Sequence, residues 1–283
     1  MKPDPRFLNL SKDFWAHVRL ISERLRYSDR ATHQIKVPSF EDQVGSLDVL
    51  GMSGGRIADD SGKPTHFGKQ LSNYFDYRAN VLNNTVEPCL MDAPAAKDLF
   101  NEVRRRLKSR IPIPMNKQKG KKKQPAYLTG MVNMIIHNRC KEQGCDFDPR
   151  VLIRITRNGL PLRALARRVD GAFPSTLNPV AVWEIKEYYY TTTFGSRVAD
   201  GIYETLLDGM ELEELRINER IDVKHYLLLD SHYTWWECGR SYLCRVIDML
   251  HMGYVDEVLF GKEVVDRLPA IVDEWLQILK DRE

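Results

Sequence analysis

The chain has 283 residues, of which 43% are hydrophobic and 29% charged, so it carries ample apolar side chains for a core and lacks the composition of a disordered chain. Its 42 basic and 39 acidic residues leave a formal net charge of +3, which is too small to indicate a polyanionic partner. No apolar run approaches the roughly 18 residues that a membrane span requires, and the charged, proline-broken beginning excludes a signal peptide. The five cysteines favour a reducing compartment over a disulfide scaffold, so we expect a cytoplasmic protein without a membrane partner.

The first third of the chain combines helical and loop-like patterns. Apolar residues recur at helical spacing over residues 14–26, and a second helix is expected at 94–108 with Asp92 as its N-cap. Between them, the glycine-rich stretch 39–69 predicts an extended loop or short hairpins. We therefore assign residues 1–115 to a helical and loop region that serves in recognition or dimerisation.

A lysine-rich segment follows this region. The sequence KQKGKKKQP at 117–125 predicts a basic linker or loop at residues 116–126. The lysines that we expect to contact DNA phosphates are Lys119, Lys121, Lys122 and Lys123. A solvated loop without a partner is the alternative.

From residue 127 to 283 the pattern becomes regular. Helices are expected at 127–140, 194–216, 241–254 and 268–279, and strands at 151–156, 160–173, 180–189 and 223–229. The pair Asn158-Gly159 between the first two strands is a strong hairpin signal. The resulting order, α-β-β-β-α-β followed by helices, predicts an α/β fold with a mixed sheet flanked by helices.

Two acids and a lysine fall where neighbouring strands end. Side chains alternate along a strand, so Glu184 and Lys186 share one face of the third strand, while Asp170 lies near the end of the second. Pairing of these strands through the loop at 174–179 brings the three side chains to one edge of the sheet. Carboxylate oxygens suit Mg²⁺, and the main-chain carbonyl of Ile185 is a further candidate ligand.

This set of residues fits the chemistry of phosphodiester hydrolysis. A metal ion held by the carboxylates would activate an attacking water and stabilise charge on the phosphate, and Lys186 would orient that water or stabilise the transition state. The alternative is a surface salt bridge, which contributes little to stability.

The segment Val169-Asp170, thirteen intervening residues, then Glu184-Ile185-Lys186, resembles the signature of the PD-(D/E)XK nuclease superfamily. The α-β-β-β-α-β order is similar to the core of that superfamily. The resemblance implies Mg²⁺-dependent hydrolysis of nucleic acids, with Asp170 and Glu184 as metal ligands and Lys186 as the catalytic lysine. Ala199 stands four residues before Tyr203 where the exonuclease branch has glutamine, which argues against that branch. As a compact chain with a variable N-terminal region, it is most similar to type II restriction endonucleases.

Several residues around this motif remain alternatives. The segment Asp222-Val223-Lys224 also has the acid-x-lysine form, but it follows a helix and begins a strand. Members of the superfamily often take a third acidic ligand from an upstream helix, for which Glu41, Glu87 and Glu102 are candidates.

Three further residues are candidates for phosphate contacts. Arg168 flanks the expected site and could instead pair with Glu184, whereas Ser196 and Arg197 lie at the start of the long helix. A helix start suits either phosphate binding or simple capping.

We therefore expect a sequence-specific type II endodeoxyribonuclease that cuts double-stranded DNA as a homodimer, because a two-fold dimer most simply cuts both strands of a palindrome. Mg²⁺ is the expected cofactor, Mn²⁺ is expected to substitute for it, and Ca²⁺ is expected to be non-catalytic. The alternatives are a nonspecific or structure-specific repair or defence nuclease of the same fold, and a catalytically silent DNA-binding module.

Overall fold

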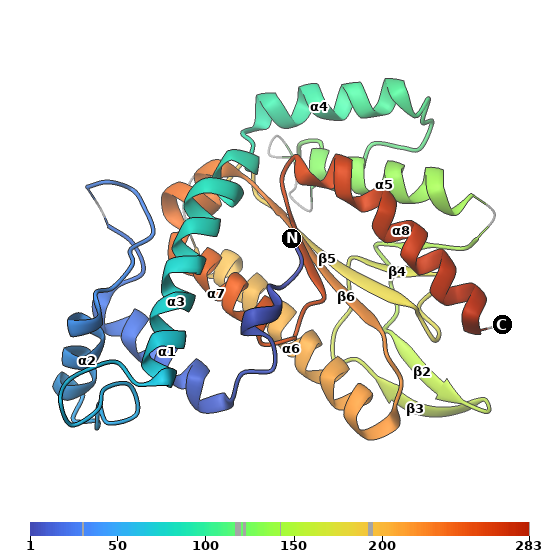
Figure 1. Cartoon of the computed structure of the whole chain (residues 1–283). Helices are drawn as coiled ribbons and strands as arrows, with labels where there is room; N and C mark the ends of the chain where they lie inside the picture. Colours follow the sequence, from blue (N-terminus) through green and yellow to red (C-terminus); the bar gives the residue numbers. More distant parts are fainter. Residues whose placement is uncertain (30, 117–119, 121–122, 142, 192–194, 283) are drawn as a thin grey trace.

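The structure is a computed structural model that describes residues 1–29, 31–116, 120, 123–141, 143–191 and 195–282 (Figure 1). Its centre is a five-stranded sheet with the order β1-β4-β5-β6-β7. The strands are β1 (Asp146–Phe147), β4 (Gly171–Phe173), β5 (Ala181–Glu187), β6 (Lys224–Asp230) and β7 (Glu257–Phe260). The first two pairings are antiparallel and the last two are parallel, so the predicted α/β fold with a mixed sheet is confirmed.

One face of the sheet is covered by three helices, α4 (Ala93–Arg106), α5 (Tyr127–Cys140) and α8 (Glu263–Arg282). Helices α5 and α8 lie on the strands, and α4 packs outside α5 (Figure 1). Trp183 of β5 stacks on Trp275 of α8 with ring centroids 5.4 Å apart. Trp183, Trp275 and the apolar side chains of α5 form one continuous core.

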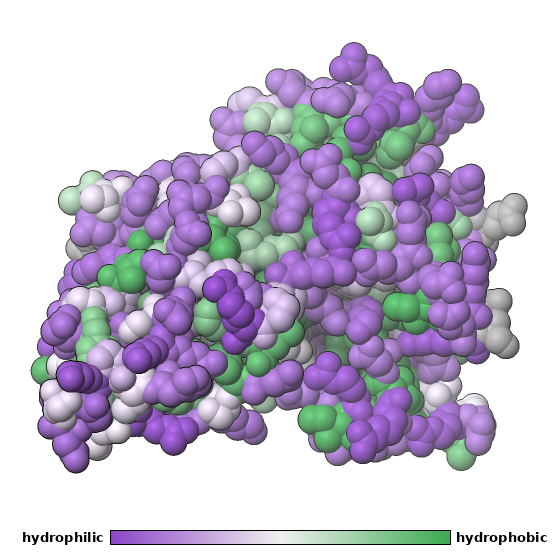
Figure 2. Space-filling model, in the orientation of Figure 1, coloured by the Kyte–Doolittle hydropathy of each residue, from purple (hydrophilic) through white to green (hydrophobic). Residues whose placement is uncertain are grey.

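The opposite face is covered by α6 (Ser196–Glu219) and α7 (Arg240–His251). A π-helix, η5 (His232–Cys238), connects β6 to α7. Val182 of β5 packs on this side with Leu212 and Leu215 of α6. Figure 2 shows that the molecular surface in this view is mostly hydrophilic, with apolar patches between the polar side chains.

The N-terminal helices lie beside the layer formed by α7 (Figure 1). They are α1 (Lys12–Leu25), α2 (Phe40–Val49) and α3 (His66–Val81), with short turns η1 (Pro5–Phe7), η2 (Leu82–Val86) and η3 (Glu87–Cys89). Arg78 of α3 forms a buried ion pair with Asp248 of α7 at 2.9 Å, and Tyr74 donates a hydrogen bond of 2.6 Å to the same carboxylate. A charged contact therefore joins the N-terminal helices to the sheet-containing part.

Most of the predicted helices are confirmed, since α1, α4, α5, α6, α7 and α8 overlap the expected ranges. The prediction of loops or hairpins throughout residues 39–69 is wrong, because residues 40–49 form helix α2. The hydroxyl of Ser39 accepts a hydrogen bond from the amide of Asp42, and acidic residues occupy the first turn. These interactions stabilise a helix start despite the nearby glycines.

The prediction of one long strand at 160–173 is also wrong. It is divided into β3 (Leu160–Ala164) and β4, and β3 pairs with β2 (Arg154–Arg157) in a separate two-stranded sheet. Asn158 and Gly159 turn this hairpin with positive φ angles of 52° and 77°. The chain leaves the strand after β3 because the amide of Ala166 donates to Glu211 of α6 instead of to a neighbouring strand.

The first expected strand, at 151–156, therefore lies in the hairpin, and the short β1 takes the place beside β4. Strand β7 was not expected, because only four residues carry its pattern. The division of the chain at residue 115 stays a prediction, although α4 of the first region packs against α5 of the last. Within the described residues, no helix is long and apolar enough to cross a membrane.

Candidate functional site

Pairing of β4 with β5 brings the predicted acids and lysine together. Gly171 pairs with Trp183, so Asp170 lies at the end of β4, where its carboxylate accepts a hydrogen bond of 2.9 Å from the amide of Ile185. Glu184 and Lys186 stand on either side of Ile185, and the Lys186 ammonium lies 2.7 Å from Glu184 Oε2. Burial lowers the pKa of Lys186, but the charges of Glu184 and Asp170 outweigh burial and raise it above its ordinary value.

The Glu184 and Lys186 side chains are enclosed between β5 and α6. Glu184 is 1% exposed and Lys186 is 6% exposed, whereas Asp170 is partly exposed. The methylene chain of Lys186 passes close to Gly201 of α6, where an added Cβ would come within 3.1 Å of its Cδ. Glycine at this position therefore leaves the space that the buried lysine occupies.

Arg167 and two acids of α6 complete the cluster. The Arg167 guanidinium contacts Asp208 at 2.6 Å, Glu184 at 2.9 Å and Glu204 at 3.1 Å. Lys186 also reaches Glu204, at 3.2 Å. In the described part of this cluster, two cations thus stand among the four carboxylates of Asp170, Glu184, Glu204 and Asp208. We call these six residues the carboxylate cluster.

The electrostatics of the carboxylate cluster favour a further cation. Burial and the charge of Glu184 raise the pKa of Asp208 to about 7, although Arg167 lies against it. Burial also acts to raise the pKa of Glu184, but Lys186 and Arg167 keep it below its ordinary value. An excess of carboxylates that pushes one of them toward protonation is an arrangement that a bound cation would relieve.

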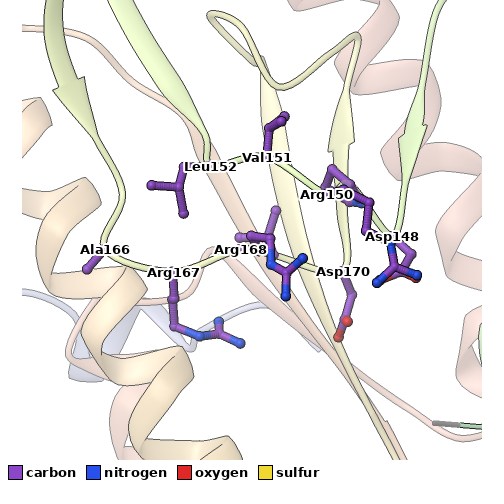
Figure 3. A pocket seen from close by; sticks show the side chains of 10 residues that line it. Asp148, Arg150, Val151, Leu152, Ala166, Arg167, Arg168 and Asp170 are labelled. Carbon is purple, nitrogen blue, oxygen red and sulfur yellow. The ribbon is translucent and has the colours of Figure 1, made fainter.

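A pocket of about 530 Å³ opens beside the cluster (Figure 3). Its lining includes the exposed Arg150 and Arg168 together with Arg167, Asp148 and Asp170. The amide of Asp148 donates to the main-chain carbonyl of Asp170 at 2.9 Å, which holds the segment after β1 against the end of β4. The pocket therefore combines two carboxylates with three guanidinium groups, of which Arg150 pairs with Asp148 at 3.1 Å. Guanidinium groups suit an anionic ligand.

Three oxygen donors at this edge are of the kinds that Mg²⁺ takes in proteins. The amide and carbonyl of one strand residue point to the same side, so the carbonyl of Ile185 faces the side where its amide meets Asp170. Mg²⁺ is commonly held by one or two carboxylates, with waters and substrate phosphates as its other ligands. Asp170, Glu184 and the Ile185 carbonyl match that donor set, although the described residues contain no group of three or more His, Cys, Asp or Glu suited to a metal ion.

The predicted DNA-contacting residues are only partly described. Arg168 lines the pocket, and Arg167 takes the ion pair with Glu184 that was considered for Arg168. Ser196 is the exposed first residue of α6, and Lys123 is exposed in the segment between α4 and α5. The remaining predicted contacts, Lys119, Lys121, Lys122 and the side chain of Arg197, lie outside the described residues.

The three candidates for an additional acidic ligand lie on other elements, with Glu41 on α2, Glu87 in η3 and Glu102 on α4. None of them lines the pocket, whereas Asp148 does.

The competing acid-x-lysine segment forms a different kind of contact. Lys224 pairs with Asp222 at 2.7 Å and with Asp256 at 3.2 Å, and all three side chains are about one third to one half exposed. This is a surface ion-pair group at the beginning of β6.

Sequence inspection did not identify Glu204 and Asp208 as members of the site. Their spacing of four residues places both on one face of α6, which was the available signal.

The fold and this site define an α/β protein with an ion-pair network buried between a mixed sheet and a helix. The model of the family described as domain of unknown function DUF7687 matches residues 91–275, and the chain belongs to this family. A second model, described as domain of unknown function DUF7690, matches residues 1–85. Comparisons with curated proteins and with solved structures gave no match. The DUF7687 match includes the whole five-stranded sheet and every residue of the carboxylate cluster.

Proposed function

We propose that the chain is a Mg²⁺-dependent endodeoxyribonuclease with a PD-(D/E)XK-type site. The observation that carries this proposal is the contact of the Asp170 carboxylate with the amide of Ile185, between Glu184 and Lys186. Acids from two adjacent strands and a buried lysine therefore meet at one place. A surface salt bridge is a poor account of them, because Glu184 and Lys186 are almost completely buried.

The arrangement of elements supports the same proposal. If the separate hairpin of β2 and β3 is treated as an insertion, the remaining succession α5, β1, β4, β5, α6 and β6 has an α-β-β-β-α-β form, with β1 in place of the strand expected at 151–156. Its strands are adjacent in the order β1-β4-β5-β6, with two antiparallel pairings followed by a parallel one. This order puts the ends of β4 and β5 next to α6, where the six members of the carboxylate cluster meet.

Each residue of the site has a distinct role in this proposal. Asp170 and Glu184, with the Ile185 carbonyl, would hold Mg²⁺, which supplies an activated water and neutralises charge on the phosphate. Lys186 stabilises negative charge that develops on the phosphodiester. Arg167 positions Glu184 through their ion pair, and Arg150 and Arg168 attract the DNA backbone into the pocket.

The finer proposal is a sequence-specific type II restriction enzyme that acts as a homodimer in the cytoplasm. The competing proposals are a nonspecific or structure-specific repair or defence nuclease, and a catalytically silent DNA-binding module. Discrete fragments from plasmid DNA favour the sequence-specific restriction enzyme, and a smear favours the nonspecific nuclease. A silent module binds DNA in Ca²⁺ but does not cleave it in Mg²⁺.

The test is digestion of plasmid DNA by the purified full chain, in Mg²⁺ and in EDTA, with Asp170→Asn and Lys186→Met beside the wild type. We expect Mg²⁺-dependent cleavage that falls at least about a hundredfold in both variants, since each removes charge at the reacting phosphate. Lys224→Met is the matched control, because it removes the lysine of the competing Asp222-Val223-Lys224 segment. It should cleave like the wild type.

Circular dichroism and thermal unfolding distinguish loss of chemistry from loss of structure. Asp170→Asn is the more reliable variant here, because Asp170 is partly exposed whereas Lys186 neutralises a buried acid. Full activity in a folded Asp170→Asn protein would refute the proposed site. Loss of activity in Lys224→Met with retention in Lys186→Met would move the site to the beginning of β6.

A further inference from the structure

The stretch between Glu102 and Glu142 holds much of the positive charge of the chain. It contains twelve lysines and arginines and no acidic residue, whereas the whole chain has a net charge of only +3. The rest of the chain is therefore net acidic, and the excess positive charge is gathered in this stretch. A basic concentration of this kind is the electrostatic footprint of a surface that binds a polyanion.

Five of these cations lie at the end of α4 and directly after it. They are Arg104, Arg105, Arg106, Lys108 and Arg110, which we call the α4 basic patch. Arg104 is partly exposed, and the other four are exposed. Figure 2 shows hydrophilic side chains along the upper edge of the molecule, where Figure 1 places α4 outside α5. The patch is therefore open to a large partner.

Few acidic groups oppose the α4 basic patch. Within the described residues no member of the patch forms an ion pair, and Arg105 donates only to the main-chain carbonyl of Asn101, at 3.4 Å. Helix α5, on which α4 packs, has no acidic residue. On α4 itself, Glu102 lies within about one turn of the patch and offsets one charge, and Asp98 lies a further turn away. Most of the positive charge is therefore left for a partner.

Stabilisation of α4 explains only part of the patch. Cations in the last turn of a helix interact favourably with its dipole, which accounts for arginines up to the helix end at Arg106. Lys108 and Arg110 follow the helix, where this effect no longer acts. Exposed Lys123 continues the positive charge along the chain, and the lysines at 117, 119, 121 and 122 lie outside the described residues.

The chain returns from the patch to the edge of the sheet that carries the proposed site. The two ends of the lysine segment are joined there, because the amide of Ala126 donates to the carbonyl of Pro114 at 2.9 Å. In the first turn of α5, the amide and hydroxyl of Thr129 each donate a hydrogen bond of 3.0 Å to Glu187. Glu187 ends β5 and follows Lys186. The basic stretch is thus anchored at the end of β5.

We propose that the α4 basic patch binds the phosphate backbone of duplex DNA outside the pocket, without reading its sequence. Duplex DNA carries one negative charge for about every 1.7 Å of its length, so a duplex held at the pocket continues past it and presents phosphates to cations on other elements. Contacts of arginine and lysine with phosphate give affinity and position but carry no sequence information. The choice of DNA as the polyanion rests on the proposed function.

The test is binding of the full chain to fluorescently labelled duplex DNA in Ca²⁺ at several salt concentrations, which requires no cleavage. One variant replaces the four exposed members of the patch, as Arg105→Gln, Arg106→Gln, Lys108→Gln and Arg110→Gln. Each phosphate contact contributes about 0.9 to the slope of log K against log salt, so the slope should flatten by about 2 or more. The Kd should rise at least about tenfold near 0.1 M salt, by the same factor for two duplexes of unrelated sequence.

A charge-matched control separates the patch from the net charge of the chain. It combines substitutions of four exposed cations outside the patch and should leave the slope unchanged: Arg216→Gln, Arg220→Gln, Lys262→Gln and Lys280→Gln. Replacement of the patch arginines by lysine should also keep the slope, because the contact requires only positive charge.

Thermal unfolding shows whether each variant is folded. The double variant Lys108→Gln/Arg110→Gln changes only residues that follow α4, so it tests the patch even if the fourfold variant loses the helix end. It should flatten the slope by about 1 or more.

An unchanged slope in the folded glutamine variants, or an equal loss in the control, would overturn the proposal. Binding to phosphatidylserine vesicles that is lost in the glutamine variants while DNA binding is unchanged would also overturn it, and would assign the patch to a membrane surface.

Cleavage assays in Mg²⁺ separate this proposal from the preceding one. DNA binding that depends on the patch, in a chain that does not cleave, would contradict the proposed function alone. Cleavage by a chain whose DNA binding does not depend on the patch would contradict the role of the patch alone.

Discussion

The buried ion pair between Arg78 and Asp248 offers a direct test of how the N-terminal helices are attached. Asp248 accepts two hydrogen bonds from Arg78, at 2.9 and 3.1 Å, and one from Tyr74 at 2.6 Å. Arg78 also donates to Ser22 of α1 at 2.9 Å. Arg78 is 2% exposed and Asp248 is 4% exposed, so water cannot replace a lost partner. The carboxylate thus organises α1, α3 and α7 together.

We predict that Asp248→Asn lowers the free energy of unfolding by about 3–5 kcal/mol, because it leaves the Arg78 charge buried without its counter-ion. Such a loss is a large part of the total stability of about 5–15 kcal/mol that is typical of folded domains. Burial lowers the pKa of Arg78, but the attraction of Asp248 outweighs burial and raises the pKa above its ordinary value. Although Asp248→Asn removes this attraction, arginine does not lose its proton in proteins, so the guanidinium remains charged in the variant.

Urea unfolding followed by circular dichroism and by tryptophan fluorescence measures this change. Asp273→Asn is the matched control, since its pair with Arg139 at 3.1 Å is exposed and should contribute less than about 1 kcal/mol. The double variant Arg78→Met/Asp248→Asn should lose less stability than the two single losses added together, because it leaves no unpaired charge. A loss below about 1 kcal/mol in Asp248→Asn, or strict additivity, would refute this account of the contact.

Three other perturbations have defined outcomes. Gly171→Ala should destabilise the fold by about 1–3 kcal/mol in thermal unfolding, because the added Cβ would lie 2.0 Å from the Trp183 ring. Gly45→Ala is the control, since its added Cβ would meet nothing within 4 Å and the substitution should not destabilise the fold. Burial raises the pKa of Asp230 from 3.8 to about 7, so the wild type loses stability as the pH rises from 3.8 through about 7. The stability of Asp230→Asn relative to the wild type should therefore increase by about 2–4 kcal/mol from pH 4 to pH 8 in urea unfolding, and equal pH profiles would contradict this. Neutralising the lysines at 121–123 should weaken DNA binding and flatten its salt dependence, and an unchanged slope would assign them to a solvated loop.

The sequence by itself determined the elements whose patterns are long and local. Helices α5 and α6 and strands β5 and β6 lie close to their expected ranges, because each one buries a periodic set of apolar side chains. Alternation along β5 also determined that Glu184 and Lys186 share one face. The Asn158-Gly159 turn was identifiable because it depends on the backbone preferences of two residues.

Only the tertiary structure decided what surrounds those residues. Arg167, not Arg168, pairs with Glu184, and Glu204 joins the cluster from α6. Arg167 meets Glu184 only when the segment between β3 and β4 folds against β5, and Glu204 meets Lys186 only when α6 packs on β5. The split of the expected strand at 160–173 has the same origin, since Ala166 donates its amide to α6. Local patterns fix which residues face inward, whereas packing between elements fixes which of them touch.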